Sequence, residues 1–285
     1  MQHQKLFIIG LFLIATFTNC EKSCDEVENC QELEHDGLVR NYWLHVPDSL
    51  AKNPALVFVL RGYTGTPQNL MKHSKFNNLA NKYGFVVCYP KGIKDKYRNL
   101  HWDADLEISE TDDVGFLTNL AKALQEKYEL NSHRTFVCGM SNGGYMSYTL
   151  ACRASETFRA VASVTGTMSE LTWKECGNSS PIPVLQIHGI ADDVVPIDGT
   201  MTTDDGWGNA PELDSVMRFW ANKNQCLTMD STAITSKTNA YFYKNCVDNH
   251  QVWYYKIEDY GHSWPVMADA NFEASEVIWE FFSQF

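Results

Sequence analysis

A serine flanked by glycines lies in the middle of the chain, in the pentapeptide Gly139-Met140-Ser141-Asn142-Gly143. The apolar residues 135–138 before it predict a strand, and residues 145–154 after it predict a helix. A tight strand-to-helix turn leaves no space for side chains beside its apex, which accounts for the two glycines. The hydroxyl then projects from the sheet edge, near helix N–H groups that can stabilise a developing oxyanion. This pattern predicts that Ser141 is a nucleophile.

A serine hydroxyl is a weak nucleophile at neutral pH, so the prediction requires an acid and a base further along the chain. Residues 183–187 predict a buried strand, and the loop after it carries Asp192 and Asp193. An aspartate just after a strand is well placed to orient a histidine. We take Asp192 as the acid and keep Asp193 as the alternative, because spacing does not separate neighbours. A third possibility is that the aspartate only caps a turn.

His262 is the predicted general base. Residues 252–257 are aromatic and β-branched and predict the last strand, and His262 lies in the loop that follows. An imidazolium cannot accept the serine proton, so activity should fall when His262 is protonated. His188 at the end of the preceding predicted strand is interpreted as a packed imidazole, and His73 as a helix surface residue.

Three motifs resemble the extracellular polyhydroxybutyrate depolymerase and feruloyl esterase group of α/β-hydrolases. They are Gly139 to Gly144, His188-Gly189 with Asp192 and Val195-Pro196, and Gly261-His262-Ser263-Trp264-Pro265. The resemblance runs from about Asp36 to the C-terminus. It implies serine-dependent hydrolysis of carboxylic esters through an acyl-enzyme, with nucleophile, acid and base in that chain order. It also implies an α/β fold with a mostly parallel sheet and helices on both faces.

The oxyanion hole is inferred from the same resemblance. One donor would be the backbone N–H of Asn142, and the other that of Tyr63 or Thr64, after the third strand. Such enzymes usually carry His-Gly in that loop, whereas this chain has Arg61-Gly62. A backbone donor does not depend on its neighbour's side chain, so we expect Arg61 to change how the loop is held without abolishing activity.

Three tryptophans in predicted loops are candidate substrate contacts. Trp102, Trp207 and Trp264 could stack on a phenolic acyl group or a sugar ring. For Trp264, packing against the catalytic loop is an equally open alternative.

The motifs leave three functions open. We favour a secreted esterase that removes feruloyl or acetyl groups from plant-type polysaccharide. A polyhydroxyalkanoate depolymerase is the alternative, although such enzymes often carry extra polymer-binding segments. A non-catalytic, surface-anchored binding protein is disfavoured because Ser141, Asp192 and His262 are all present.

Composition narrows the partners. The 285 residues carry a formal net charge of −12, which disfavours nucleic acid or an anionic membrane surface as partner. The expected partner is an ester substrate, polysaccharide-linked or polymeric. No cysteine or histidine cluster has zinc-ligand spacing, so we expect no metal, and nothing implies a cofactor.

The N-terminus predicts export. Residues 1–19 resemble a signal peptide, with Lys5 followed by an apolar stretch too short for a permanent anchor. Cys20 directly after it makes a lipid anchor at the cell surface the alternative to free secretion. Residues 20–35 are expected to form a short N-terminal segment, and residues 36–285 a single catalytic domain.

Nine cysteines in an exported chain predict disulfides. Cys226–Cys246 is the favoured pair, at the base of a polar segment, residues 227–245, that we expect to be a loop. Weaker pairs are Cys24–Cys30 and Cys152–Cys176, and Cys88 and Cys138 are expected as buried thiols.

Two helices have clear start signals. Thr66-Pro67 predicts the start of one helix that reaches Tyr83, and Asp112 and Asp113 predict the start of another that reaches Tyr128. Acidic residues at a helix start stabilise its dipole, so we interpret these two as structural.

Overall fold

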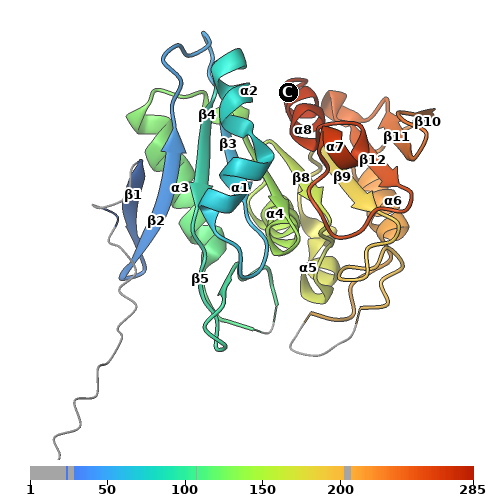
Figure 1. Ribbon diagram of the computed structural model, residues 1–285, viewed down its shortest axis with the longest axis horizontal. Helices are drawn as coiled ribbons and strands as arrows, with labels where there is room; N and C mark the ends of the chain where they lie inside the picture. The colour runs from blue at the N-terminus through green and yellow to red at the C-terminus, as the bar shows by residue number, and fades with distance from the viewer. Residues whose placement is uncertain (1–23, 25–28, 107, 202–206) are drawn as a thin grey trace, which may run out of the picture.

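The computed structural model describes Cys24 and residues 29–106, 108–201 and 207–285. Within these residues, ten strands form one sheet in the order β1-β2-β4-β3-β7-β8-β9-β12-β11-β10 (Figure 1). The six strands from β4 to β12 in that order run parallel, and an antiparallel hairpin extends each edge. The predicted α/β-hydrolase fold with a mostly parallel sheet is confirmed.

The elements alternate along the chain as a parallel sheet requires. The strands of the large sheet are β1 (Cys30–His35), β2 (Leu38–His45), β3 (Leu56–Leu60), β4 (Val86–Pro90), β7 (Thr135–Met140), β8 (Ala160–Val164), β9 (Val184–Gly189), β10 (Thr228–Ala233), β11 (Thr238–Lys244) and β12 (Val252–Ile257), and β5 (Ile93–Lys94) pairs with β6 (Leu100–His101). The helices are α1 (Pro67–Ser74), α2 (Phe76–Tyr83), α3 (Asp113–Lys127), α4 (Asn142–Arg153), α5 (Glu170–Glu175), α6 (Leu213–Lys223), α7 (Met267–Ala270) and α8 (Ala274–Phe282).

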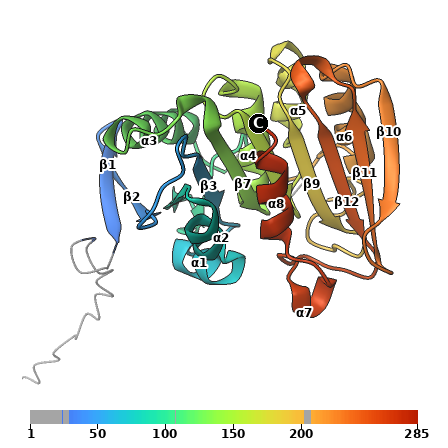
Figure 2. The same ribbon diagram turned by 90° about the horizontal axis from the view of Figure 1, so that it is seen from above.

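Helices cover both faces of the sheet, which creates two hydrophobic cores. Helices α1, α2 and α8 pack on one face, and α3, α4 and α6 pack on the other (Figure 2). Successive side chains of a central strand enter opposite cores; Phe58 of β3 lies in one, and Val57 and Val59 lie in the other. Because both faces are covered, all five residues of β3, β4 and β8 are buried.

Two expected elements differ from the structure. The single helix predicted from Pro67 to Tyr83 is wrong, because Lys75 adopts a left-handed conformation with φ 54° and separates α1 from α2. The polar segment 227–245 is a hairpin of β10 and β11 instead of a loop. Every residue of β10 is exposed at the sheet edge, so this strand needs no apolar face and has no alternating pattern to predict it.

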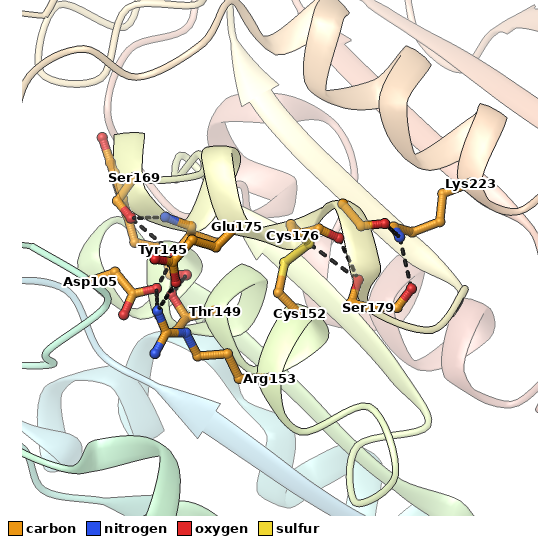
Figure 3. The surroundings of a disulfide bond; sticks show 12 residues. Asp105, Tyr145, Thr149, Cys152, Arg153, Ser169, Glu175, Cys176, Ser179 and Lys223 are labelled. Atoms are coloured by element: carbon orange, nitrogen blue, oxygen red, sulfur yellow. Dashed lines mark hydrogen bonds and ion pairs between the residues drawn. A yellow bond between two sulfur atoms is a disulfide. The ribbon is translucent and has the colours of Figure 1, made fainter.

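All three predicted disulfides are confirmed: Cys24–Cys30, Cys152–Cys176 and Cys226–Cys246. Cys88 and Cys138 are buried thiols, and burial raises the pKa of both. Figure 3 shows the bridge that joins α4 to the end of α5. Beside it, Arg153 of α4 contacts Glu175 of α5 at 2.8 Å and Asp105, in the segment between β6 and α3, at 3.0 Å.

Of the first 28 residues, the structure describes Cys24 alone. The predicted signal peptide and Cys20 lie outside the described residues. Residues 30–35 form β1 and pair with β2, so the sheet begins before the domain start expected at residue 36. None of the helices in the described ranges is long and apolar enough to cross a membrane.

Candidate active site

Ser141 lies at the turn between β7 and α4, in a strained backbone conformation. Its φ is 55° and its ψ is −121°, a region that a residue with a side chain seldom adopts. Three backbone hydrogen bonds hold it there: its N–H donates to Val164 O at 2.9 Å, and its carbonyl accepts from Gly144 at 2.7 Å and Tyr145 at 3.0 Å. The turn therefore fixes Ser141 through backbone geometry, as the pentapeptide predicts.

The glycines of the turn are required by close backbone contacts. A Cβ on Gly139 would lie 2.2 Å from the carbonyl oxygen of Gly143, and a Cβ on Gly143 would lie 2.3 Å from that of Leu60. Distances this short exclude any side chain. The helix start thus packs directly on the ends of β7 and β3.

The loop after β3 lies against Ser141. A Cβ on Gly62 would be 3.1 Å from the Ser141 Cβ and 3.7 Å from its Oγ. The Thr64 N–H donates to Leu100 O at 2.9 Å, which removes Thr64 from the two alternatives for the oxyanion hole. Tyr63 is held by its side chain, whose hydroxyl donates to Asp95 at 2.6 Å and accepts from Asn99 at 2.9 Å.

Arg61 is almost fully buried, with 1% of its surface exposed. Its Nη1 donates to the carbonyl of Gly62, which ties the side chain to the loop it precedes. Within the described residues, Nε and Nη2 have no hydrogen-bond partner. Burial lowers the pKa of this guanidinium to about 10, while the charge of Asp113 opposes the shift. Arg61 therefore places a buried positive charge, with two nitrogens that no described residue pairs, beside the loop that follows β3.

Trp102 holds the turn between β7 and α4 through hydrogen bonds to Asn142. Its backbone N–H donates to Asn142 Oδ1 at 2.7 Å, and Asn142 Nδ2 donates back to the Trp102 carbonyl at 3.0 Å. The indole N–H donates to Arg61 O at 3.1 Å, and the side chain is 0% exposed. The structure contradicts the prediction that Trp102 contacts substrate, because its ring is enclosed by the residues that it holds.

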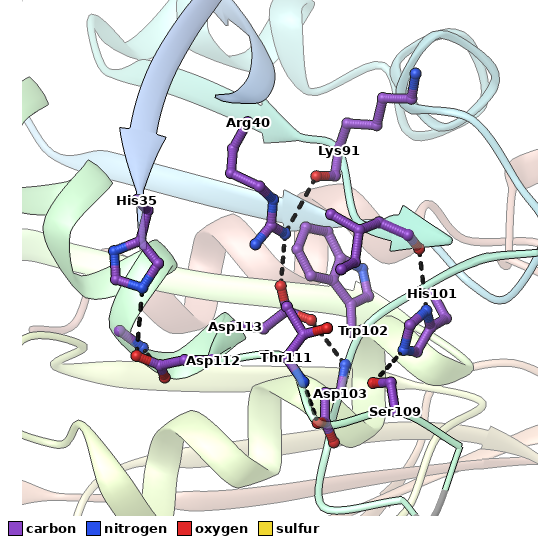
Figure 4. A network of polar contacts seen from close by, with 12 residues as sticks. His35, Arg40, Lys91, His101, Trp102, Asp103, Ser109, Thr111, Asp112 and Asp113 are labelled. Carbon is purple, nitrogen blue, oxygen red and sulfur yellow. Dashed lines mark hydrogen bonds and ion pairs between the residues drawn. The ribbon is translucent and has the colours of Figure 1, made fainter. Parts of the chain in front are cut away.

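A buried ion pair fixes the segment that carries Trp102 (Figure 4). Asp113 accepts from Arg40 Nη2 at 2.5 Å and from the backbone N–H of Asp103 at 2.7 Å. Asp112 accepts from Gly115 N at 2.7 Å and caps α3. Both aspartates are structural, as expected from their place at the helix start, but Asp113 acts through a salt bridge that the sequence did not indicate.

The same region contains a group with metal-ligand atoms. Within the described ranges, His35, Asp36 and Asp112 place one ligand atom each within 4.8 Å of one another. His35 is already paired with Asp112 at 3.3 Å and Asn119 at 3.0 Å, and both carboxylates are more than half exposed. These contacts account for the group as hydrogen bonds at the start of α3.

Asp192 and His262 are in direct contact. The two carboxylate oxygens lie 2.9 and 3.1 Å from His262 Nδ1. Asp192 also accepts the backbone N–H groups of Val194 at 3.0 Å and Val195 at 2.9 Å. Burial alone raises the pKa of this carboxyl, but the bonds from His262 and Val195 outweigh it and lower the pKa. Asp193 is exposed, so the structure favours Asp192 of the two alternatives.

Ser141 and His262 line one cleft of about 450 Å³. Trp264 is in its wall, 6% exposed, with its indole N–H 3.2 Å from Ser275 Oγ. Trp207 packs instead against Tyr63 and Tyr145, at ring separations of 5.3 and 5.7 Å. Lining residues that we did not predict include five from α1 and the segment around α7: Asn69, Leu70, His73, Val266 and Asp269.

Comparison with known proteins identifies the family. The Esterase PHB depolymerase family matches residues 40–225, and the chain belongs to it. The matched range includes Ser141 and Asp192, and His262 lies beyond it.

Two sequence relatives and one structure illustrate the similarity. A candidate esterase, NocK of Nocardia uniformis subsp. tsuyamanensis, is 29% identical over 66% of this chain and 56% of its own. The bifunctional acetylxylan esterase/xylanase XynS20E of Neocallimastix patriciarum is 24% identical over 87% of this chain and 34% of its own. The chain thus spans about half the length of these relatives, or less. The acetyl xylan esterase structure from Aspergillus awamori has a TM-score of 0.69 at 17% identity, covering 89% of this chain and 98% of that one.

Proposed function

We propose that the protein is a serine carboxylic-ester hydrolase in which Ser141, His262 and Asp192 form a catalytic triad. The observation that carries the proposal is the hydrogen bond that His262 Nδ1 donates to Asp192, beside a cleft that His262 shares with a strained Ser141. The carboxylate holds Nδ1 in its protonated form, so Nε2 is the nitrogen that can accept a proton.

The reaction then proceeds in two steps. Ser141 Oγ attacks the ester carbonyl as its proton moves to His262, and the backbone N–H groups of Asn142 and Tyr63 stabilise the oxyanion. Collapse of this intermediate releases the alcohol, which takes the proton from His262. Water, deprotonated by the same imidazole, then cleaves the acyl-enzyme, releases the acid and restores the serine.

We propose acetyl groups on xylan-type polysaccharide as the substrate, and the extracellular space as the location. The names of the relatives from Neocallimastix patriciarum and Aspergillus awamori support this substrate, and three disulfides fit an oxidising compartment. Feruloyl esters are the second candidate, because the cleft is large for an acetyl group and has Trp264 in its wall.

A panel of acetylated xylan, methyl ferulate and polyhydroxybutyrate tests the substrate, with Ser141→Ala as the matched control. We expect acetate release from xylan that the variant lacks. Turnover of the polyester with no release of acetate or ferulate would favour the alternative function, a polyhydroxyalkanoate depolymerase. No turnover of any ester, including a soluble aryl acetate, would contradict the proposed activity itself.

A further inference from the structure

His188 is a buried histidine that the mechanism does not use, yet it lies against the catalytic acid. It is the penultimate residue of β9 and is 0% exposed. Its Nε2 lies 3.4 Å from Asp192 Oδ2, and it is not among the residues that line the cleft of Ser141 and His262. A neutral His188 carries one ring proton, on either Nδ1 or Nε2.

The hydrogen bonds of Gln186 determine which nitrogen of His188 carries the proton. Gln186 Nε2 lies 3.0 Å from the carbonyl of Gly166, and a carbonyl can only accept, so this atom must be the amide nitrogen. Its Oε1 correspondingly accepts from the hydroxyl of Tyr148 at 2.8 Å. The same amide nitrogen lies 2.9 Å from His188 Nδ1, which must therefore be the unprotonated, accepting nitrogen.

The proton of His188 consequently lies on Nε2 and points at the acid loop. Nε2 donates to the carbonyl of Val195 at 2.8 Å, with Asp192 Oδ2 as its second neighbour. The N–H of the same Val195 donates to Asp192 Oδ1 at 2.9 Å. Burial lowers the pKa of His188 to about 4, so the ring is neutral and does not compete with His262 as a cation for Asp192.

We propose that His188 is a positioning residue that holds Asp192 and its loop in the orientation that bonds His262, with its tautomer set by Gln186. The inference rests on the proposed triad. The chain of bonds begins on α4, the helix that starts at the nucleophile, and ends on the acid, so it joins the two halves of the site.

A double-mutant cycle of His188→Leu and Asp192→Asn tests this with the full chain and a soluble aryl acetate. If His188 acts through Asp192, His188→Leu lowers kcat by about ten- to a hundredfold with KM unchanged. The double variant should then be within about twofold of Asp192→Asn alone. Losses that multiply, or a wild-type kcat in His188→Leu, would overturn the proposal.

Three further variants make the test specific. His188→Gln retains an amide donor and should recover part of the lost kcat. Gln186→Glu, when ionised, only accepts, so it draws a proton onto His188 Nδ1; it should lower kcat even if His188→Leu fails to fold, and a wild-type kcat there contradicts the role of Gln186. His250→Leu is the matched control, because His250 is 2% exposed and bonds to Asn224 outside the cleft. It should lower stability and leave kcat unchanged; an equal loss of kcat would mean that any buried histidine has this effect.

The cycle also separates this inference from the proposed function. If Ser141→Ala keeps the wild-type rate, the triad itself is wrong. If Ser141→Ala is inactive and the His188 and Gln186 variants are unchanged, only the positioning role is wrong.

Discussion

The proposed nucleophile and the proposed acid–base pair are positioned by different means. Ser141 lies on an element junction where backbone packs on backbone, at contacts too close for a side chain. Asp192 and His262 lie in loops after β9 and β12, and side-chain hydrogen bonds to neighbouring residues fix their relation. One half of the site is therefore held by close backbone packing at glycines, and the other by side-chain hydrogen bonds.

The difference predicts how each half fails. Side chains added at the glycines of the turn that carries Ser141 should destabilise the fold, because they would overlap backbone atoms of β3 and α4. Changes in the loops that carry Asp192 and His262 should lower the rate while the fold remains. These loops lie at the ends of β9 and β12, so a change there displaces few other side chains.

The largest expected effect is on the rate. Ser141→Ala should reduce kcat/KM for an aryl acetate by at least about 10³-fold, because it removes the hydroxyl proposed to form the acyl-enzyme. Circular dichroism and the urea midpoint should stay at the wild-type values or rise, since alanine relieves no packing contact and removes only a hydroxyl. An unchanged rate would place the nucleophile elsewhere.

A pair of glycine substitutions compares the two halves directly. Gly143→Ala should lower the free energy of unfolding by about 3 kcal/mol or more, or prevent folding, because its Cβ overlaps two backbone carbonyls. Gly261→Ala, next to His262, should be tolerated within about 0.5 kcal/mol, since the nearest atom is 3.8 Å away. Urea denaturation measures both; equal losses would remove the distinction between the halves.

Arg61 sharpens the comparison because activity and stability should change in opposite directions. Arg61→Met removes a buried cation with two unpartnered donor atoms, so the free energy of unfolding should stay constant or increase. The variant also removes the donor to Gly62 O. The loop after β3, which carries the proposed oxyanion donor Tyr63, should then be held less firmly, and kcat should fall by roughly tenfold. A drop in stability without a change in kcat would show that Arg61 only supports the core.

The smallest expected effect is a pH dependence of stability. Burial lowers the pKa of both His188 and His250 from 6.5 to about 4. Between these values the unfolded chain binds a proton on each ring and the folded chain does not, so the free energy of unfolding decreases as pH falls from 6.5 to 4. Urea midpoints across this window should show a shallower slope for His250→Leu; an identical slope would mean that His250 titrates normally.

The sequence predicted the nucleophile half more completely than the acid–base half. Gly139, Ser141 and Gly143 carry a steric requirement that is local in sequence, so a short motif is sufficient to indicate it. Asp192 could not be separated from Asp193 by spacing, because only the three-dimensional contact with His262 distinguishes them. His188 was interpreted as a packed residue, since its hydrogen bonds reach segments that no local pattern connects to it.

The fold was predictable where burial imposes a period or an unbroken apolar run. The strands β7, β9 and β12 and the helices α3 and α4 follow their expected ranges closely. The β10–β11 hairpin was missed because an exposed edge strand carries no such pattern, and the break at Lys75 because a left-handed lysine has no sequence signal. Trp102 was placed in an open loop because its burial depends on the Arg40–Asp113 pair and on Asn142, which are distant in the chain.

Covalent trapping tests the central claim most directly. The protein would be incubated with an aryl phosphonate ester, which transfers its phosphonyl group to an activated serine and releases the phenol. Intact-mass and peptide mass spectrometry should find one phosphonyl group on Ser141, with labelling slowed strongly in His262→Ala. A protein that hydrolyses aryl acetate yet is labelled at another residue, or labels Ser141 equally fast without His262, would contradict the account.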